Sequence, residues 1–99
     1  MTVTEQRYPI RTFKRPMDAR EEAKHLVQEA AEVFSAYEDW ESTRGPKLVP
    51  HFMEEAADLA QNLANLVNCV TGNPYGTDMT GYIREVYRKN ESRGWEYQE

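Results

Sequence analysis

Apolar residues recur at helical spacing in three stretches of this chain. In the first stretch they stand at Ala23, Leu26, Val27, Ala30, Phe34 and Tyr37. This spacing predicts a helix with one buried side. Asp18 lies three residues before Glu21, which is the spacing of a capping box at a helix start. Because Arg44-Gly45-Pro46 breaks the pattern, we expect this helix to run from Asp18 to about Trp40 or Ser42.

Two further helices are predicted after this break. Pro50 suits the first turn of a helix that continues to about Thr71, where a Gly-Asn-Pro sequence stops it. The third helix can be capped by Thr77 or Asp78 and should end near Gly94. Its apolar positions follow the i, i+3, i+4 rule and are Met79, Tyr82, Ile83, Val86 and Tyr87. Since no segment alternates like a strand, we expect an all-α fold.

The two ends of the predicted fold differ from its middle. Residues 1–17 contain two prolines and few periodic apolar residues, which predicts an extended basic arm before a helical domain at 18–99. From Leu59 to Thr71 there is no charged residue. A helix without charge over three turns is usually enclosed on most sides, and two other helices cannot enclose it. We therefore expect a three-helix chain that completes a four-helix-type bundle by oligomerisation, as a homodimer or a dimer of dimers.

Composition and charge narrow the class of protein. The chain has 99 residues and a net charge of −5, which disfavours a partner that is a nucleic-acid polymer. Cys69 is the single cysteine, so no internal disulfide can form, and no apolar run reaches the roughly 18 residues of a membrane span. We expect a cytoplasmic protein that contacts no membrane. Residues 1–17 hold four basic residues against one acidic one, whereas residues 18–58 hold four against eleven. This distribution suits a metal bound to phosphate, or simply a solvated acidic surface.

Polar side chains form a line beside the apolar stripe on each of the first two helices. On the first helix the line is Glu22, His25, Glu29 and Glu32. On the second it is His51, Glu55, Asp58, Asn62, Asn65 and Cys69. If the two lines face each other, four carboxylates meet, and each pair repels by roughly 4 kcal/mol at about 4 Å and an effective dielectric near 20. A hard cation relieves such repulsion, so the pattern predicts Mg²⁺ or Mn²⁺, although ordinary exposed helix charges share the spacing.

Two residues in these lines have a less specific interpretation. Glu22 and His25 form one Glu-x-x-His, a motif that di-iron bundles use twice, so His25 is better explained as a surface or supporting histidine. Cys69 has no histidine or lysine at helical spacing and is interpreted as a packed residue.

The acidic pairs resemble a known family. The segments Glu29-Ala-Ala-Glu32 and Glu55-Ala-Ala-Asp58 are similar to the E-x-x-E and E-x-x-D signature of the MazG-like all-α nucleoside triphosphate pyrophosphohydrolase superfamily. That superfamily includes phosphoribosyl-ATP pyrophosphohydrolase and dimeric dUTPases, and the resemblance covers roughly residues 18–95. It implies Mg²⁺-dependent cleavage of a nucleoside triphosphate between the α and β phosphates. It also implies that the four acids are metal ligands, with Glu29 or Glu32 acting on the attacking water.

Other polar residues are candidates for substrate binding. Lys89, Asn90 and Arg93 span one turn of the third helix and suit phosphate oxygens, or they complement the helix dipole. Trp95 can stack on a base or pack against a partner subunit. The second helix also offers two amides, Asn62 and Asn65. They can contact a sugar or a base, or they are buried amides whose hydrogen bonds a partner subunit satisfies.

The sequence leaves the preferred nucleotide open. The basic arm can complete the pocket or be disordered, and its cations are Arg7, Arg11, Lys14 and Arg15. An alternative function is a non-catalytic helical oligomerisation or regulatory module that binds nucleotide without hydrolysing it. A small helical adaptor, which should not respond to Mg²⁺, is a third alternative.

Overall fold

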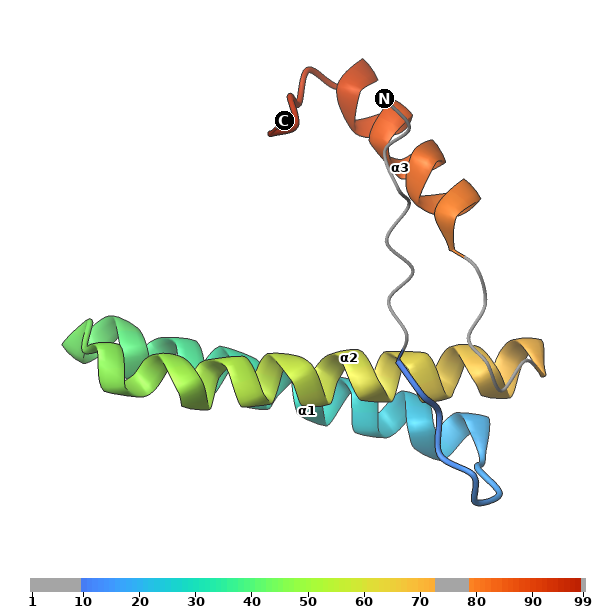
Figure 1. The fold of residues 1–99 in the computed structure, drawn as a ribbon, viewed down its shortest axis with the longest axis horizontal. Coiled ribbons are helices and arrows are strands. Elements are labelled where there is room, and N and C mark those ends of the chain that lie inside the picture. Colours follow the sequence, from blue (N-terminus) through green and yellow to red (C-terminus); the bar gives the residue numbers. More distant parts are fainter. Residues whose placement is uncertain (1–9, 73–78, 99) are drawn as a thin grey trace. The chain divides into compact units, whose positions relative to one another are not determined.

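The computed structural model describes residues 10–72 and 79–98, which form helices and connecting segments (Figure 1). Its elements are α1 (Ala19–Thr43), the 3₁₀ turn η1 (Pro46–Leu48), α2 (Val49–Thr71) and α3 (Thr80–Ser92). None of the described residues lies in a strand, so the predicted all-α class is confirmed. The chain divides into two compact units, one with α1, η1 and α2 and the other with α3. Each unit is described separately below.

Local signals set the ends of α1. The Asp18 carboxylate accepts hydrogen bonds from the backbone N–H groups of Arg20 at 2.8 Å and Glu21 at 3.2 Å, as the predicted N-cap requires. The helix ends at Thr43, slightly later than predicted. Arg44 follows in the left-handed region at a φ of 52°, and its guanidinium lies 4.9 Å from the centre of the Trp40 ring. This cation–π contact accompanies a conformation that glycine usually adopts.

The ends of α2 agree closely with the prediction. The helix begins at Val49, directly after η1, so Pro50 lies in its first turn as predicted. It ends at Thr71, and Gly72 forms the C-cap at a φ of 74°. The N–H of Gly72 donates to the carbonyl of Asn68 at 2.7 Å. Glycine adopts this backbone conformation without the steric cost of a Cβ atom.

The helices α1 and α2 pack side by side as an antiparallel hairpin (Figure 1). The side of α1 that is withdrawn from solvent includes Glu22, Glu29, Val33 and Ala36. The predicted apolar stripe lies partly elsewhere, because Phe34 remains 60% exposed. One neighbouring helix covers only part of a helix circumference, and α2 covers the side next to the stripe.

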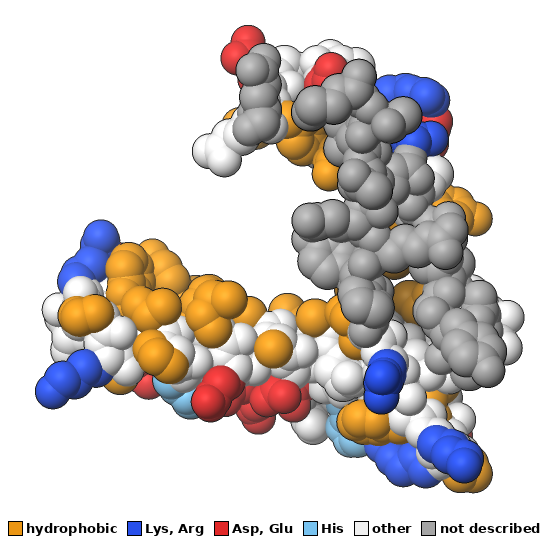
Figure 2. All heavy atoms as spheres, in the orientation of Figure 1, with side chains coloured by type: hydrophobic (Ala, Val, Ile, Leu, Met, Phe, Trp, Pro, Cys, Tyr) orange, Lys and Arg blue, Asp and Glu red, His pale blue; other side chains and the backbone are white. Residues whose placement is uncertain are grey.

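The hairpin therefore has two chemically different long sides. Hydrophobic side chains line one of them, and acidic side chains gather on the other (Figure 2). The exposed large apolar residues of the two helices are Val27, Phe34, Tyr37, Val49, Met53, Leu63 and Val70. The acidic side contains the carboxylates that the sequence analysis selected.

The described part of the predicted arm lies against α2. Residues 10–17 form neither helix nor strand, and three amide side chains of α2 hold them. Gln61 donates to the carbonyl of Arg11 at 2.7 Å, and Asn68 donates to the hydroxyl of Thr12 at 3.3 Å. Asn65 accepts from the backbone N–H of Phe13 at 3.2 Å. Residues 1–9 of the predicted arm lie outside the described residues.

The second unit consists of α3 and the segment that follows it. Met79 occupies the N-cap position, whereas the predicted caps Thr77 and Asp78 lie outside the described residues. The helix ends at Ser92 rather than near Gly94, and the N–H of Trp95 then donates to the carbonyl of Asn90 at 3.0 Å. The chain turns here because Gly94 adopts a φ of 93°.

Candidate metal site

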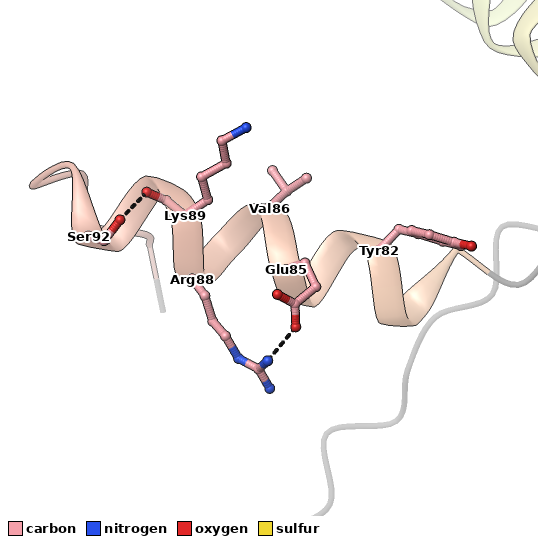
Figure 3. Close-up of a pocket in the computed structure, with 6 residues that line it drawn as sticks. All are labelled: Tyr82, Glu85, Val86, Arg88, Lys89 and Ser92. Carbon is pink, nitrogen blue, oxygen red and sulfur yellow. Dashed lines mark hydrogen bonds and ion pairs between the residues drawn. The ribbon is translucent and has the colours of Figure 1, made fainter.

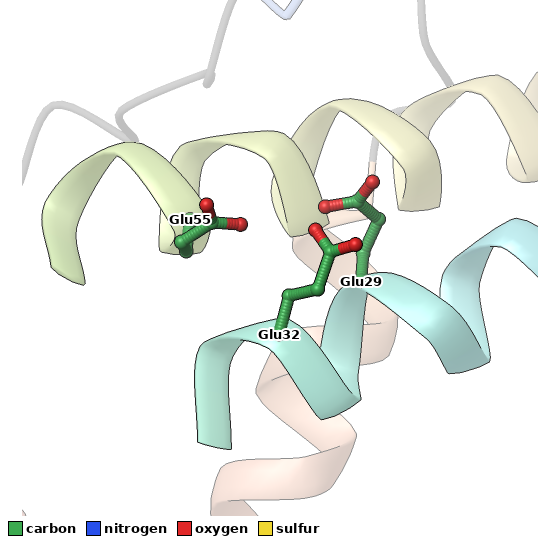
Figure 4. Close-up of side chains that lie close together, drawn as sticks. All are labelled: Glu29, Glu32 and Glu55. Atoms are coloured by element: carbon green, nitrogen blue, oxygen red, sulfur yellow. The ribbon is translucent and has the colours of Figure 1, made fainter. Parts of the chain in front are cut away.

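Three of the four predicted metal ligands meet on the acidic side of the hairpin. Glu29 and Glu32 extend from α1 and Glu55 extends from α2, and their carboxylates point toward one another (Figure 4). One oxygen from each lies within 4.8 Å of the others. Residues three apart lie on one face of a helix, so α1 presents its two acids together, and the antiparallel packing brings α2 opposite them. The two predicted polar lines therefore face each other at this point.

Asp58 takes a different place from the other three acids. It is exposed, and the described group of closely spaced oxygens does not include it. Its charge nevertheless reaches the site, since it raises the pKa of both Glu29 and Glu55. Its part as a ligand stays a prediction.

The electrostatics of the cluster disfavour full ionisation. Burial raises the pKa of Glu29 above its ordinary value, and the charges of Glu32 and Asp58 raise it further. Burial also raises the pKa of Glu55, followed by its hydrogen bond with Glu32, while His51 acts in the opposite direction. The carboxylates of Glu29 and Glu55 thus lose hydration and face other negative charges. A proton or a cation at this position relieves both costs.

Two oxygens of the cluster are suited to a cation. Oε2 of Glu29 and Oε2 of Glu55 are buried and have no hydrogen-bond donor among the described residues. Buried acceptors without donors are costly unless they are protonated or bind a cation. Carboxylate oxygens without thiolate or imidazole in the group are the donor set of Mg²⁺ or Mn²⁺. The residues present therefore fit the predicted metal.

The polar line continues along the hairpin into a buried region. Glu22 is only 2% exposed, and one of its carboxylate oxygens lies 3.5 Å from the guanidinium of Arg15. Asn65 is completely buried, and its side-chain oxygen accepts from both Phe13 and Gln61. Its contact with substrate stays a prediction, and its side-chain oxygen already accepts from the arm. Asn62 is half-buried and makes no hydrogen bond within the described part of the chain.

The contacts of the arm were missed in the sequence. The amides that hold it are Gln61, Asn65 and Asn68, which follow an i, i+4, i+7 spacing along α2. This spacing places them on one face, and it could have identified them as a polar ladder. Their partners are backbone groups and a hydroxyl of a segment about fifty residues away in sequence, which no local pattern reveals.

Neither histidine belongs to the three-carboxylate group. His25 and His51 are both exposed, and the group of ligand atoms found among the described residues contains carboxylates alone. Cys69 is a free, half-buried thiol. These positions agree with the interpretation of His25 as a surface histidine and of Cys69 as a packed residue.

The remaining predicted substrate contacts lie in the unit of α3. Asn90 donates to the hydroxyl of Tyr97 at 2.7 Å, while Trp95 is 68% exposed. Lys89 and Arg93 are exposed and form no ion pair within the described residues. Lys89 also borders a shallow hollow of about 610 Å³, together with Tyr82, Glu85, Val86, Arg88 and Ser92 (Figure 3). The contribution of these residues to the carboxylate site stays a prediction.

Comparisons with known proteins add no relative. No family model matches this chain, and neither a curated protein nor a solved structure matches it. Within residues 10–72 and 79–98, no helix has the length and apolar character that crossing a membrane requires.

Proposed function

We propose that this chain is a Mg²⁺-dependent nucleotide pyrophosphohydrolase. The observation that carries the proposal is the convergence of Glu29, Glu32 and Glu55 from two helices, with oxygens within 4.8 Å. Two of these carboxylates bury an oxygen that has no donor in the described part of the chain, which supports a cation at this place. The resemblance to the MazG-like signature rests on these three residues and Asp58, and it implies the reaction.

The proposed reaction divides the work among the acids. Glu29 and Glu55 would hold the cation through their buried oxygens. When bound, the cation would neutralise phosphate charge and orient the phosphates. Glu32 is more exposed and accepts the proton of the attacking water, with Glu29 as the other candidate. The water oxygen bonds to the α phosphorus, and the bond to the α–β bridging oxygen breaks. A nucleoside monophosphate and pyrophosphate are released.

Substrate recognition completes the proposal. We assign phosphate binding to Lys89, Asn90 and Arg93, and base stacking to Trp95. Contact with the sugar or base is assigned to Asn62 and Asn65. Lys89 and Arg93, which are exposed and form no ion pair within the described residues, and the exposed Trp95 ring support these assignments. The substrate panel described below identifies the base that fits.

We further propose that the chain works as a homodimer or a dimer of dimers. The apolar side of the hairpin supports this, since Val27 is 70% exposed, Phe34 60% and Met53 57%. Contiguous apolar patches above a few hundred Å² usually mark interaction sites on soluble domains. Association through this side completes a four-helix-type bundle and leaves the carboxylates on the opposite side of each hairpin.

A substrate panel tests the proposed function. The chain is incubated with Mg²⁺ and each ribo- and deoxynucleoside triphosphate, and phosphoribosyl-ATP is included. Pyrophosphate and monophosphate are the expected products. Glu32→Gln should abolish turnover, whereas Glu38→Gln, at an exposed acid of the same helix outside the cluster, should not. Binding of Mg²⁺ and triphosphate without products would favour the regulatory module, and orthophosphate as the only product would contradict α–β cleavage.

A further inference from the structure

The described arm places positive charge at one end of the acidic line. Arg11, Lys14 and Arg15 are all exposed, and the segment that carries them is fixed to α2. The contacts that fix it use the Arg11 carbonyl, the Thr12 hydroxyl and the Phe13 N–H, at 2.7 to 3.3 Å. None of these contacts uses a charged group of the arm. These contacts therefore position the arm without using its cations, of which Arg15 forms an ion pair with Glu22.

Arg15 has the most defined place among these cations. Its guanidinium lies 3.5 Å from the buried carboxylate of Glu22 and 5.2 Å from the centre of the Phe13 ring, while 57% of its side chain is exposed. A guanidinium has five N–H donors. One long contact with Glu22 leaves most of them directed to solvent. Glu22 and Phe13 thus hold the orientation of a group whose donors are available.

The distance from Arg15 to the carboxylate cluster is short enough for a single ligand to reach both. Glu22 precedes Glu29 by seven residues on α1, which is about two turns or roughly 10 Å along the helix axis. An arginine side chain extends several ångströms from its backbone, so Arg15 can approach the far end of a ligand anchored at the cluster. A ligand that spans both places must bind a cation at the end that meets the carboxylates. It must carry negative charge along its length to reach Arg15.

We propose that the arm is the second half of the phosphate site, in which Arg15 binds the leaving pyrophosphate end of the substrate and Glu22 positions it. This deepens the proposed function and rests on it. Arg11 and Lys14 add positive potential beside the same end. The arm thereby offsets the repulsion that eleven acids within residues 18–58 exert on a polyphosphate.

Calorimetric binding of inorganic tripolyphosphate to the full chain in Mg²⁺ tests this proposal without requiring turnover. Arg15→Ala should weaken binding about ten- to hundredfold, as expected for loss of a charge-assisted contact. Arg15→Lys should restore part of the affinity, because it keeps the charge but loses the fork. Arg20→Ala removes the same charge from an exposed position on α1 and serves as the matched control. Equal affinities of Arg15→Ala and Arg20→Ala would overturn the proposal.

Two additional variants separate binding from folding. Arg15→Ala leaves the buried Glu22 carboxylate without its cation. The double variant Arg15→Ala/Glu22→Gln also removes the charge of Glu22, and it should bind tripolyphosphate as weakly as Arg15→Ala does. Gln61→Ala alters no charge but removes the hydrogen bond to the Arg11 carbonyl that holds the arm on α2. It should therefore weaken tripolyphosphate binding less than Arg15→Ala does. Full affinity in the folded double variant would contradict the role of Arg15.

The outcomes also distinguish the two proposals. Arg15-dependent binding of tripolyphosphate without hydrolysis of any nucleotide supports the arm and overturns the proposed reaction. Hydrolysis with a KM that Arg15→Ala leaves unchanged supports the reaction and overturns the arm. When both hold, Arg15→Ala raises KM for the triphosphate, while binding of Mg²⁺ alone is unchanged.

Discussion

Replacement of Glu32 by glutamine removes the carboxylate that acts on both of its neighbours. Burial is the largest cause of the raised pKa of Glu29 and of Glu55, and the charge of Glu32 and its hydrogen bonding raise both further. With oxygens within 4.8 Å, two unit charges repel by about 3.5 kcal/mol at an effective dielectric near 20 and by about 0.9 kcal/mol in water. Because Glu32 is exposed, we take the solvent-screened value of about 1 kcal/mol for the pair with Glu29.

This repulsion energy predicts both the direction and the size of the change in thermal stability. In the absence of divalent metal, Glu32→Gln should raise the free energy of unfolding by about 1 kcal/mol, which corresponds to about 4–8 °C in Tm for a chain of this size. In saturating Mg²⁺ the order should reverse. The wild type gains about 2.7 kcal/mol when free metal is a hundredfold above Kd, whereas the variant has lost a ligand and gains less.

Differential scanning fluorimetry with a chelator and then with increasing Mg²⁺ measures both effects. Glu38→Gln, which changes the charge of α1 equally outside the cluster, should leave both the metal-free Tm and the response to Mg²⁺ nearly unchanged. A lower metal-free Tm for Glu32→Gln would refute the repulsion argument. An undiminished Mg²⁺ response would refute the assignment of Glu32 to the metal site.

Four further predictions follow from the same structure. Since burial raises the folded-state pKa of Glu29 above its ordinary 4.5, the metal-free chain should lose stability as pH rises from about 4.5 through the raised value, as pH-dependent unfolding can measure. Asp18→Ala should cost about 1 kcal/mol by removing the α1 cap, measured by urea unfolding. Gly72→Ala should cost about 1–2 kcal/mol in the same assay, because φ is 74°. Phe34→Glu should prevent the proposed association, so that light scattering finds an oligomer for the wild type and a monomer for the variant, since this exposed ring lies on the proposed interface.

Much of the secondary structure was predictable because its signals are local. The Asp18 carboxylate caps α1 from two and three residues away, and Gly72 ends α2 through its own backbone freedom. Such interactions depend on a few neighbouring residues, so the printed sequence contains them. The third helix ends at Ser92, two residues before the predicted Gly94, and the carbonyl of Asn90 then accepts from the N–H of Trp95.

The candidate site was predictable in its composition and only partly in its geometry. The spacing of Glu29 and Glu32 fixes them on one face of α1 whatever the fold. That Glu55 lies opposite them, and that Asp58 remains exposed outside the close group, depends on the rotation and register of two packed helices. Helical periodicity specifies neither quantity, since each requires contacts between distant residues.

The sequence by itself determined the helical class, the ends of α1 and α2 and the pairing of acids at helical spacing, because these follow from interactions within a few residues. Only the tertiary structure decided which side of α1 meets α2, so that Phe34 is exposed while Glu22 is buried. It also decided that the arm forms hydrogen bonds with the side-chain amides around Asn65. Both outcomes depend on which surfaces pack against α2. That packing joins segments that lie far apart in the chain, so local sequence patterns do not specify it.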